Sequence, residues 1–318
     1  MSINVKRLQP TRVYRFYRGG AQLGRFRGTE EADGSFPEDW VCSVTDASNP
    51  GREETDAGLT RLEDGRLLRD AIAENPESWL GGPHLARFGE TPAVLVKLLD
   101  PVERVLVHAH PDRAFAAQHL GSRFGKTEAW IVLETRAKTG EAFVGLREEI
   151  DPALYRNWIE RQEVETLLGS LNCLTLRAGD LVYVPAGVPH AIGGGMLIAE
   201  LQEPTDFSLI CEWEGFPVQP EDAHLGLGWD TAMLALDLRA HEPVRVLPEA
   251  AAAFFWGDDR PKAADRFAAL IVLEGEGEID GLPTRRGDVF AVPAAVDELD
   301  ASGDLRVLRC LAPDAALP

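Results

Sequence analysis

Short runs of apolar residues recur along the whole chain, separated by glycine, proline and aspartate. Apolar runs of roughly four to eight residues bounded by turn-forming residues are typical of β-strands. The clearest are AVLVKLLD, RVLVHAH, AWIVLE, DLVYVP, MLIAELQ, FSLICEW, ALIVLEG, DVFAVP and LRVLRCL. Many short strands of this kind favour an all-β sandwich or barrel over alternating strands and helices.

Helical spacing is confined to a few segments. Apolar residues recur at helix-like intervals in RLLRDAIAENPESWLG (66–81) and in ALYRNWIERQEVETLLGSL (153–171). We therefore predict a mainly β protein with a small helical insertion at about 153–171.

A sequence repeat indicates how the strands are grouped. The segments AGDLVYVPAGVPHAI (178–192) and RGDVFAVPAAVDELD (286–300) share the pattern G-D-x-x-x-V-P-A. The matching pairs are Gly179 and Gly287, Asp180 and Asp288, Val184 and Val292, and Pro185 and Pro293. Recurrence of one turn-and-strand pattern predicts two related β-barrels. We expect a first domain at 1–215, which includes the insertion, and a second at 216–318.

Three histidines and a glutamate form a candidate metal site in the first barrel. Residues two apart on a strand face the same side, so RVLVHAH directs His108 and His110 together. Glu128 and His190 are suitable further ligands, and the set suits zinc, manganese or ferrous iron. The alternative is a pair of core histidines bonded to backbone carbonyls. Where the first copy of the repeat has His190, the second has Glu298, so we expect the second barrel to lack a metal.

Charge and composition narrow the possible partners. The net charge of −20 repels phosphate backbones and anionic lipid, which argues against nucleic acid and membrane partners. Neither a signal-like segment nor a membrane-length apolar run is visible. The four cysteines form no CxxC pair, which suits reduced thiols. We expect a cytoplasmic protein; the sequence does not indicate its oligomeric state.

Three segments together resemble a known family. LVKLLDPVERVLVHAHPDRAFA, GKTEAWIVL and VPAGVPHAI are similar to the corresponding segments of type I mannose-6-phosphate isomerases, in their short bacterial cupin form. The resemblance is strong over roughly 92–215, loose before it, and limited to the repeat pattern after it. It implies two cupin-type jelly-roll barrels and a metal-dependent interconversion of an aldose and a ketose through an enediol. The implied substrates are mannose 6-phosphate and fructose 6-phosphate, or a related sugar.

The resemblance also implies roles for individual residues. The zinc ligands of the family fall on His110, Glu128 and His190, and a glutamine ligand of the family falls on His108. The active-site lysine of the family falls on Lys126. We accordingly expect one divalent metal ion, zinc foremost, with Lys126 beside it as a catalytic residue. The sequence does not indicate the catalytic base.

The chain departs from the family where a phosphate would need positive charge. Leu209 stands in the place of the family's active-site arginine, and Gly194 in the place of a lysine. No lysine or arginine occurs from 178 to 238, a stretch with ten acidic residues. The substrate is therefore either a neutral sugar or a sugar phosphate held by other cations, such as Arg113, Arg123 or the amino-terminal arginines. We expect it to lie beside the acidic segment from Glu200 to Asp206.

Two other functions remain open at this stage. A non-catalytic carbohydrate-binding or regulatory protein derived from the same family would explain the missing arginine. A manganese or iron enzyme acting with oxygen would use the same three-histidine, one-glutamate set, but the spacing of GKTEAW from the histidines favours the isomerase.

Overall fold

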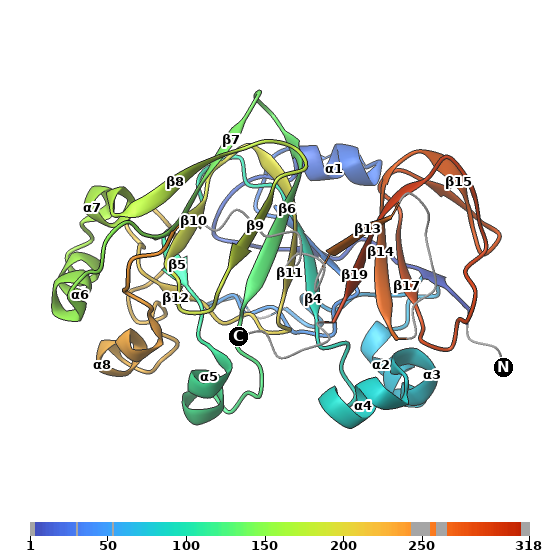
Figure 1. Ribbon diagram of the computed structural model, residues 1–318, viewed down its shortest axis with the longest axis horizontal. Coiled ribbons are helices and arrows are strands. Elements are labelled where there is room, and N and C mark those ends of the chain that lie inside the picture. The colour runs from blue at the N-terminus through green and yellow to red at the C-terminus, as the bar shows by residue number, and fades with distance from the viewer. Residues whose placement is uncertain (1–3, 30, 53, 243–254, 259–265, 313–318) are drawn as a thin grey trace.

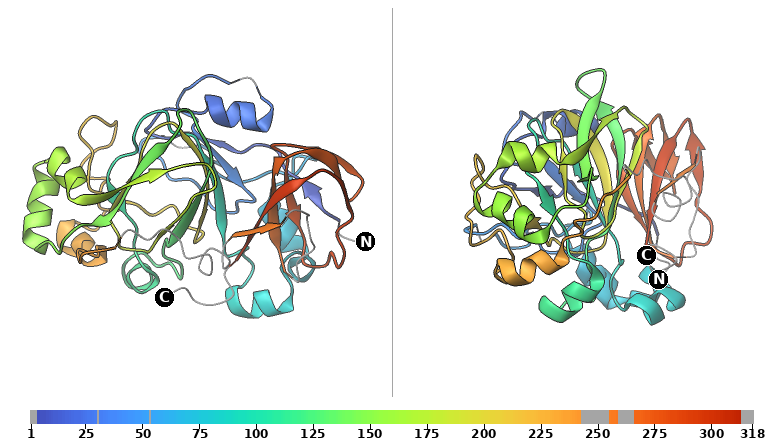
Figure 2. Two further views of the ribbon diagram at one scale, coloured as in Figure 1. Left: turned by 45° about the horizontal axis from the view of Figure 1, so that its top comes forward. Right: turned by 60° about the vertical axis from the view of Figure 1, so that its left-hand side comes forward.

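The computed structural model describes residues 4–29, 31–52, 54–242, 255–258 and 266–312. It confirms the predicted fold class, because antiparallel β-sheets form most of the regular structure (Figure 1). Two groups of strands lie side by side, and short helices surround them (Figure 2).

The first barrel consists of two facing sheets. Its six-stranded sheet has the order β2 (Arg12–Val13), β3 (Glu38–Val41), β4 (Leu95–Leu99), β11 (Met196–Gln202), β6 (Glu128–Thr135) and β9 (Leu181–Val184). Its five-stranded sheet has the order β12 (Leu209–Ile210), β5 (His108–Ala109), β10 (His190–Ile192), β7 (Gly140–Leu146) and β8 (Leu171–Leu176). Apolar side chains from both sheets fill the space between them.

The second barrel is built mainly from the carboxy-terminal strands. One sheet has the order β1 (Lys6–Arg7), β17 (Val289–Val292), β14 (Ala268–Glu274), β19 (Arg306–Leu311) and β13 (Phe255–Asp258). A smaller sheet joins β16 (Leu282–Arg285), β15 (Glu276–Ile279) and β18 (Ala301–Gly303). Since β1 pairs with β17, the amino-terminal residues contribute to this second barrel. A domain boundary near 215 stays a prediction.

The six-stranded sheet is covered on both faces, which explains its sequence. Its inner face packs within the first barrel, whereas its outer face packs against α2, α3 and the second barrel. All residues of β4 and β11 are consequently buried, and their apolar runs are continuous rather than alternating. A charged residue inside such a run is therefore exceptional. Lys97 and Glu200 are both of this kind and face the barrel interior.

The repeat seen in the sequence is one turn built twice. Gly179 and Gly287 have φ of +91° and +87°, a conformation that favours glycine. The next residue closes the turn in each copy, because Asp180 accepts from the backbone N–H of Arg177 at 2.8 Å and Asp288 from that of Arg285 at 3.0 Å. These turns lead into β9 and β17, respectively.

Both predicted helical segments are helical, each as two short helices. The segment 66–81 contains α2 (Leu68–Glu74) and α3 (Pro76–Leu80), and the insertion contains α6 (Pro152–Glu160) and α7 (Val164–Gly169). The positive φ of Gln162, 52°, separates the helices of the insertion. Short helices that the spacing did not predict are α1 (Ala21–Arg27), α4 (Gly82–Phe88), α5 (Arg113–His119) and α8 (Trp229–Ala232), which is followed by the 3-10 turn η1 (Met233–Ala235). In the described part of the chain, no helix is long and apolar enough to cross a membrane.

Candidate functional site

Three histidines gather on the inner face of the five-stranded sheet. His108 in β5 is the register partner of His190 in β10 on one side and of Ile210 in β12 on the other. His110 follows two residues after His108 and points to the same side. The ring centroids of His108 and His190 lie 4.2 Å apart, and His110 lies 4.9 Å from each.

Glu128, at the start of β6, and Lys126, two residues before it, approach these histidines from the opposite side of the barrel. Oε2 of Glu128 lies 3.2 Å from Nε2 of His110, and Oε1 lies 3.2 Å from Nε2 of His190. Nζ of Lys126 lies 2.8 Å from Nε2 of His110 and 3.2 Å from Oε2 of Glu128. The structure therefore brings together all five site residues expected from the sequence.

The hydrogen bonds of the histidines fix which nitrogen faces the centre. Nδ1 of His108 lies 2.9 Å from the carbonyl oxygen of Leu106, Nδ1 of His110 lies 2.8 Å from that of Phe207, and Nδ1 of His190 lies 2.9 Å from that of Val188. A carbonyl only accepts, so each Nδ1 carries the proton and each neutral ring presents a bare Nε2. Backbone carbonyls thus orient the three rings in the way typical of metal-binding histidines.

Burial favours the neutral form of His108 and His110, whereas neighbouring positive charge keeps Glu128 ionised. Desolvation, with a contribution from Lys126, lowers the pKa of His110 to about 3. Desolvation and the neighbouring His190 lower the pKa of His108 well below its usual value. Burial acts to raise the pKa of Glu128, but the positive charge of Lys126 outweighs it and holds this pKa well below its usual value. Neutral imidazole and carboxylate are the forms that bind divalent metal ions.

The arrangement fits a metal ion. One ligand atom from each histidine lies within 4.8 Å of the others. Nε2 of His190 and Oε2 of Glu128 are buried without a hydrogen bond of good geometry, although Lys126 is within ion-pair distance of Oε2. Facing lone pairs of imidazole and carboxylate repel one another unless a cation lies among them. The cluster could therefore hold a metal, and its nitrogen and oxygen donors suit zinc and related ions.

A cavity of about 580 Å³ opens beside the histidine cluster. His108 and Lys126 lie on its wall, so the cluster is accessible from it. Its size is that of a small-molecule site. The other charged residues on its wall are Arg15, Glu38, Arg52, Lys97, Glu200, Asp206 and Asp222.

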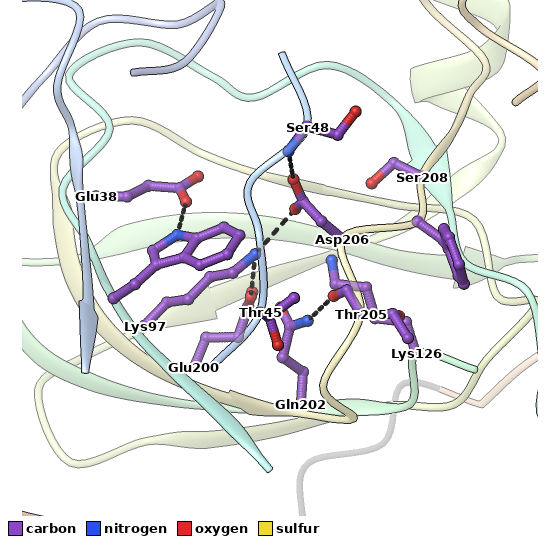
Figure 3. A network of polar contacts seen from close by, with 12 residues as sticks. Glu38, Thr45, Ser48, Lys97, Lys126, Glu200, Gln202, Thr205, Asp206 and Ser208 are labelled. Atoms are coloured by element: carbon purple, nitrogen blue, oxygen red, sulfur yellow. Dashed lines mark hydrogen bonds and ion pairs between the residues drawn. The ribbon is translucent and has the colours of Figure 1, made fainter. Parts of the chain in front are cut away.

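A row of four side chains crosses the six-stranded sheet, and two of them, Lys97 and Glu200, line the cavity. Register partners place Trp40, Lys97, Glu200 and Trp130 side by side on the inner face. Nζ of Lys97 lies 4.6 Å from the ring centroid of Trp40, 3.8 Å from Oε1 of Glu200 and 3.5 Å from Oδ1 of Asp206. Figure 3 shows Lys97 reaching between these two carboxylates. Indole Nε1 of Trp130 donates to Oε1 of Glu128 at 3.0 Å and holds that carboxylate in place.

Arg15, two residues after β2, joins the same network. Its Nε lies 3.0 Å from Oε1 of Glu38, and its Nη2 lies 2.9 Å from Oδ1 of Asp206. Burial acts to raise the pKa of Asp206, but Arg15 and then Lys97 outweigh it and lower this pKa. The same two cations lower the pKa of Glu38 against the effect of its burial. Asp206 and Glu38 are therefore fixed anions at neutral pH.

Glu200 differs from these two carboxylates. Burial, and then the negative charge of Glu128, raises the pKa of Glu200 to about 7. Lys126 and Lys97 act in the opposite direction, and Glu38 adds to the rise. A buried carboxyl that titrates near neutrality can both accept and return a proton.

The structure also locates the residues considered for phosphate binding. Arg113 pairs with Glu203, and Arg123 donates to the backbone carbonyls of Arg87 and Phe88, so neither lines the cavity. Leu209 is fully buried and packs against Phe115 and Ala232 on the far side of β12. Its neighbour Ile210 lies on the cavity wall beside His108. Ile210 therefore makes this part of the wall apolar.

The expected acidic segment contributes its end residues, Glu200 and Asp206, to the cavity wall, but the sequence did not predict Lys97 there or the contacts that join these charges. Lys97 and Glu200 had a usable signal, because each is a charged residue within an apolar strand. The pairing of Arg15 with Asp206 had no such signal, since 191 positions separate the two residues.

Comparisons with known proteins agree with the fold and point to one family. The chain matches no family model. It is 34% identical to mannose-6-phosphate isomerase ManA of Bacillus subtilis over 252 residues, which cover 71% of this chain and 78% of that protein. It is 26% identical to the mannose-6-phosphate isomerase of Streptococcus mutans over 257 residues, 73% of this chain and 79% of that protein.

Solved structures show the same architecture. The crystal structure of a mannose 6-phosphate isomerase from Bacillus subtilis aligns with a TM-score of 0.74 and 21% identity, over 96% of this chain and 99% of that one. The structure of a putative mannosephosphate isomerase from Archaeoglobus fulgidus aligns with a TM-score of 0.75 and 19% identity, over 97% of both chains.

Fold and site together define a cupin-type protein of two barrels, with a histidine cluster that could hold a metal ion. The chain belongs to the mannose-6-phosphate isomerase family. The family resemblance seen in the sequence is thereby confirmed, and the protein is an aldose–ketose isomerase by its relatives.

Proposed function

We propose that the protein is a metal-dependent isomerase that interconverts mannose 6-phosphate and fructose 6-phosphate, or a closely related pair, through an enediol. The observation that supports this best is the cavity itself. A cluster of three histidines and an ionised glutamate opens onto it, and the cavity wall also carries a carboxyl whose pKa is about 7. The relatives named mannose-6-phosphate isomerase supply the substrate class.

We assign the metal ligands to His108, His110, Glu128 and His190, and zinc is the ion that the family resemblance favours. The bound ion would supply positive charge for the oxygen atoms of the sugar at the reacting carbons. Among the described residues, Lys126 is the one ammonium that contacts the ligands themselves, through His110 and Glu128. It would hold the sugar oxygens by hydrogen bonds and add a second positive charge.

Proton transfer between the two reacting carbons requires one group that accepts a proton and returns it. We assign this role to Glu200. It lies on the cavity wall, and its pKa of about 7 matches the task. Asp206 and Glu38 are less suitable, because Arg15 and Lys97 hold both as anions with lowered pKa.

The second barrel has a supporting role in this proposal. The histidine cluster of the first barrel is the one group of possible metal ligands among the described residues. The second barrel covers the outer face of the six-stranded sheet, which carries Glu128, Lys97 and Glu200 on its inner face. It would therefore hold in place the sheet on which the site is built.

The direct test is turnover by the metal-loaded protein. Mannose 6-phosphate is supplied, and formation of fructose 6-phosphate is followed by NMR before and after treatment with a chelator. We expect turnover that the chelator removes and that added zinc restores. Failure on a panel of phosphorylated and free hexoses and pentoses would contradict the proposal. Saturable sugar binding without turnover would instead identify a non-catalytic relative.

A further inference from the structure

The charged side chains of the cavity differ in how much of their charge is already neutralised. Arg15 is buried, and its contacts engage Nε with Glu38, Nη2 with Asp206 and Nη1 with the carbonyl oxygen of Ser48 at 3.3 Å. Lys97 is enclosed by Glu200 and Asp206. These interior cations are committed to buried carboxylates and offer little to a further anion.

Lys126 is committed in the same way. Its ammonium contacts His110 and Glu128 within the candidate metal centre. A sugar 6-phosphate brings a charge close to −2, and its phosphate needs charged or N–H donors that are not already used. The interior of the cavity therefore suits the uncharged part of such a substrate better than its phosphate.

Arg52 is the exception among the described cations of the cavity wall. Its side chain is 42% exposed, and its carboxylate partner, Glu54, is 34% exposed. Nε of Arg52 lies 2.6 Å from Oε1 of Glu54. An ion pair this open to water is weak, so an incoming phosphate can take the place of the carboxylate.

The fold holds Arg52 in a defined position at the cavity mouth. Asn49 to Arg52 form a β-turn, in which the N–H of Arg52 donates to the carbonyl oxygen of Asn49 at 2.9 Å. Pro50 precedes Gly51, whose φ of +76° is the conformation that a type II turn requires after proline. The guanidinium carbon of Arg52 lies 4.2 Å from the ring centroid of Tyr14, which also lines the cavity. Stacking on an aromatic ring leaves the edge of a guanidinium available to a planar or tetrahedral anion.

The turn is also fastened to the interior. The backbone N–H of Ser48 donates to Oδ2 of Asp206 at 2.9 Å, and Nη1 of Arg15 donates to Oδ1 of Asn49 at 3.3 Å. The position of Arg52 is thereby set relative to the network that contains Lys97 and Glu200. A substrate with its phosphate at Arg52 would have its reacting carbons directed along the cavity wall toward Lys97 and Glu200.

We propose that the turn from Asn49 to Arg52 forms the phosphate-binding subsite, with the Arg52 guanidinium as its principal cation. This inference rests on the proposed function and names the part of the chain that recognises the phosphate. It accounts for an apolar residue, Ile210, beside the histidines, because the phosphate would be held at the mouth instead.

The test compares a phosphorylated and a free sugar on Arg52→Gln and wild type. We expect KM for mannose 6-phosphate to rise by about 10- to 100-fold, with kcat less affected, because a charge-assisted pair is lost. For free mannose, which has no phosphate, the turnover rate is expected to be lower, and Arg52→Gln should change it less than twofold. Inorganic phosphate should inhibit wild type competitively, and this inhibition should weaken by a similar factor in the variant. Glu54→Gln removes the competing carboxylate, so it should lower KM for the phosphosugar.

Arg66 offers a matched control. It is 50% exposed and pairs with an exposed carboxylate two residues away, Asp64, but it does not line the cavity. Arg66→Gln should therefore leave both sugars unaffected. The inference is overturned if wild type isomerises mannose 6-phosphate and Arg52→Gln has the same kinetics as Arg66→Gln. It is also overturned if Arg52→Gln slows the turnover of mannose 6-phosphate and of free mannose equally. Preference of wild type for free mannose would also overturn it. Loss of the proposed function itself has a different signature, which is failure of wild type on every sugar.

Discussion

Arg15 joins the turn at Asn49 to the buried carboxylates Glu38 and Asp206, so its removal should have a large and pH-dependent effect. The side chain is only 6% exposed, and its two carboxylate partners, Glu38 and Asp206, are 5% and 12% exposed. Arg15→Met keeps most of the apolar volume and removes the charge. Removing one partner of a buried ion pair costs about 3 to 5 kcal/mol. Lys97 remains 3.5 Å from Asp206, so we expect a loss near the lower limit, about 3 kcal/mol.

The pH dependence follows from the carboxylates that are left behind. Arg15 helps to lower the pKa values of Glu38 and Asp206, so it contributes stability above their unfolded pKa values, about 4. That contribution is lost as the pH falls through the lower folded pKa values. In Arg15→Met both carboxyls protonate more readily, which relieves the buried charge. The difference between variant and wild type should therefore shrink as the pH falls from about 7 to about 5.

Denaturant unfolding of the chelator-treated proteins at these two pH values measures the effect. Arg66→Met, which removes an exposed ion pair, should cost far less than Arg15→Met at either pH. Adding Asp206→Asn to Arg15→Met should recover part of the stability. A loss below about 1 kcal/mol, or one that does not change with pH, would refute the argument that Arg15 neutralises buried carboxylates.

Three further predictions concern the site and the repeat. Zinc should raise the melting temperature of the chelator-treated wild type, because it binds the folded state, but should have little effect on His190→Ala, as differential scanning fluorimetry would show. Glu200→Gln should retain its metal, as elemental analysis would show, but its kcat should fall by about 100-fold or more. The kcat of wild type should rise as the pH increases through about 7, because Glu200 must be ionised to accept a proton. A metal-loaded variant with unchanged kcat would contradict the role of Glu200. The two glycines of the repeat should respond differently to substitution by alanine. In Gly287→Ala the new Cβ would lie 1.9 Å from the carbonyl oxygen of Phe26, whereas in Gly179→Ala nothing lies within 4 Å of it. In urea unfolding, Gly179→Ala should lower the free energy of unfolding by roughly 1 kcal/mol of backbone strain, and Gly287→Ala by several times as much.

Local patterns in the sequence were sufficient for the fold class and the histidine cluster. The H-x-H spacing placed His108 and His110 on one face of a strand, and the repeat identified the turns at Gly179 and Gly287. Both inferences depend on residues close together in the chain. The two helices of the insertion were expected as one segment, because apolar spacing does not show the positive φ at Gln162.

The rest of the cavity depends on contacts that span the chain. Arg15, Lys97 and Asp206 meet only because β2, β3, β4 and β11 are neighbours in one sheet. The family resemblance placed the missing arginine at Leu209, but strand alternation puts Leu209 outside the cavity and Ile210 on its wall. Which of two adjacent residues faces a cavity depends on strand register, and the structure provides it.

Exchange of the proton at C2 of the sugar tests the central claim most directly. Fructose 6-phosphate and mannose 6-phosphate are incubated with the zinc-loaded protein in deuterated water, and deuterium at C2 of mannose 6-phosphate is measured by NMR. The account predicts that deuterium enters C2 during turnover, and that it does not enter with chelator-treated protein or with Glu200→Gln. Interconversion of the two sugars without any deuterium at C2 under conditions of slow turnover, or equal exchange with and without metal, would contradict it.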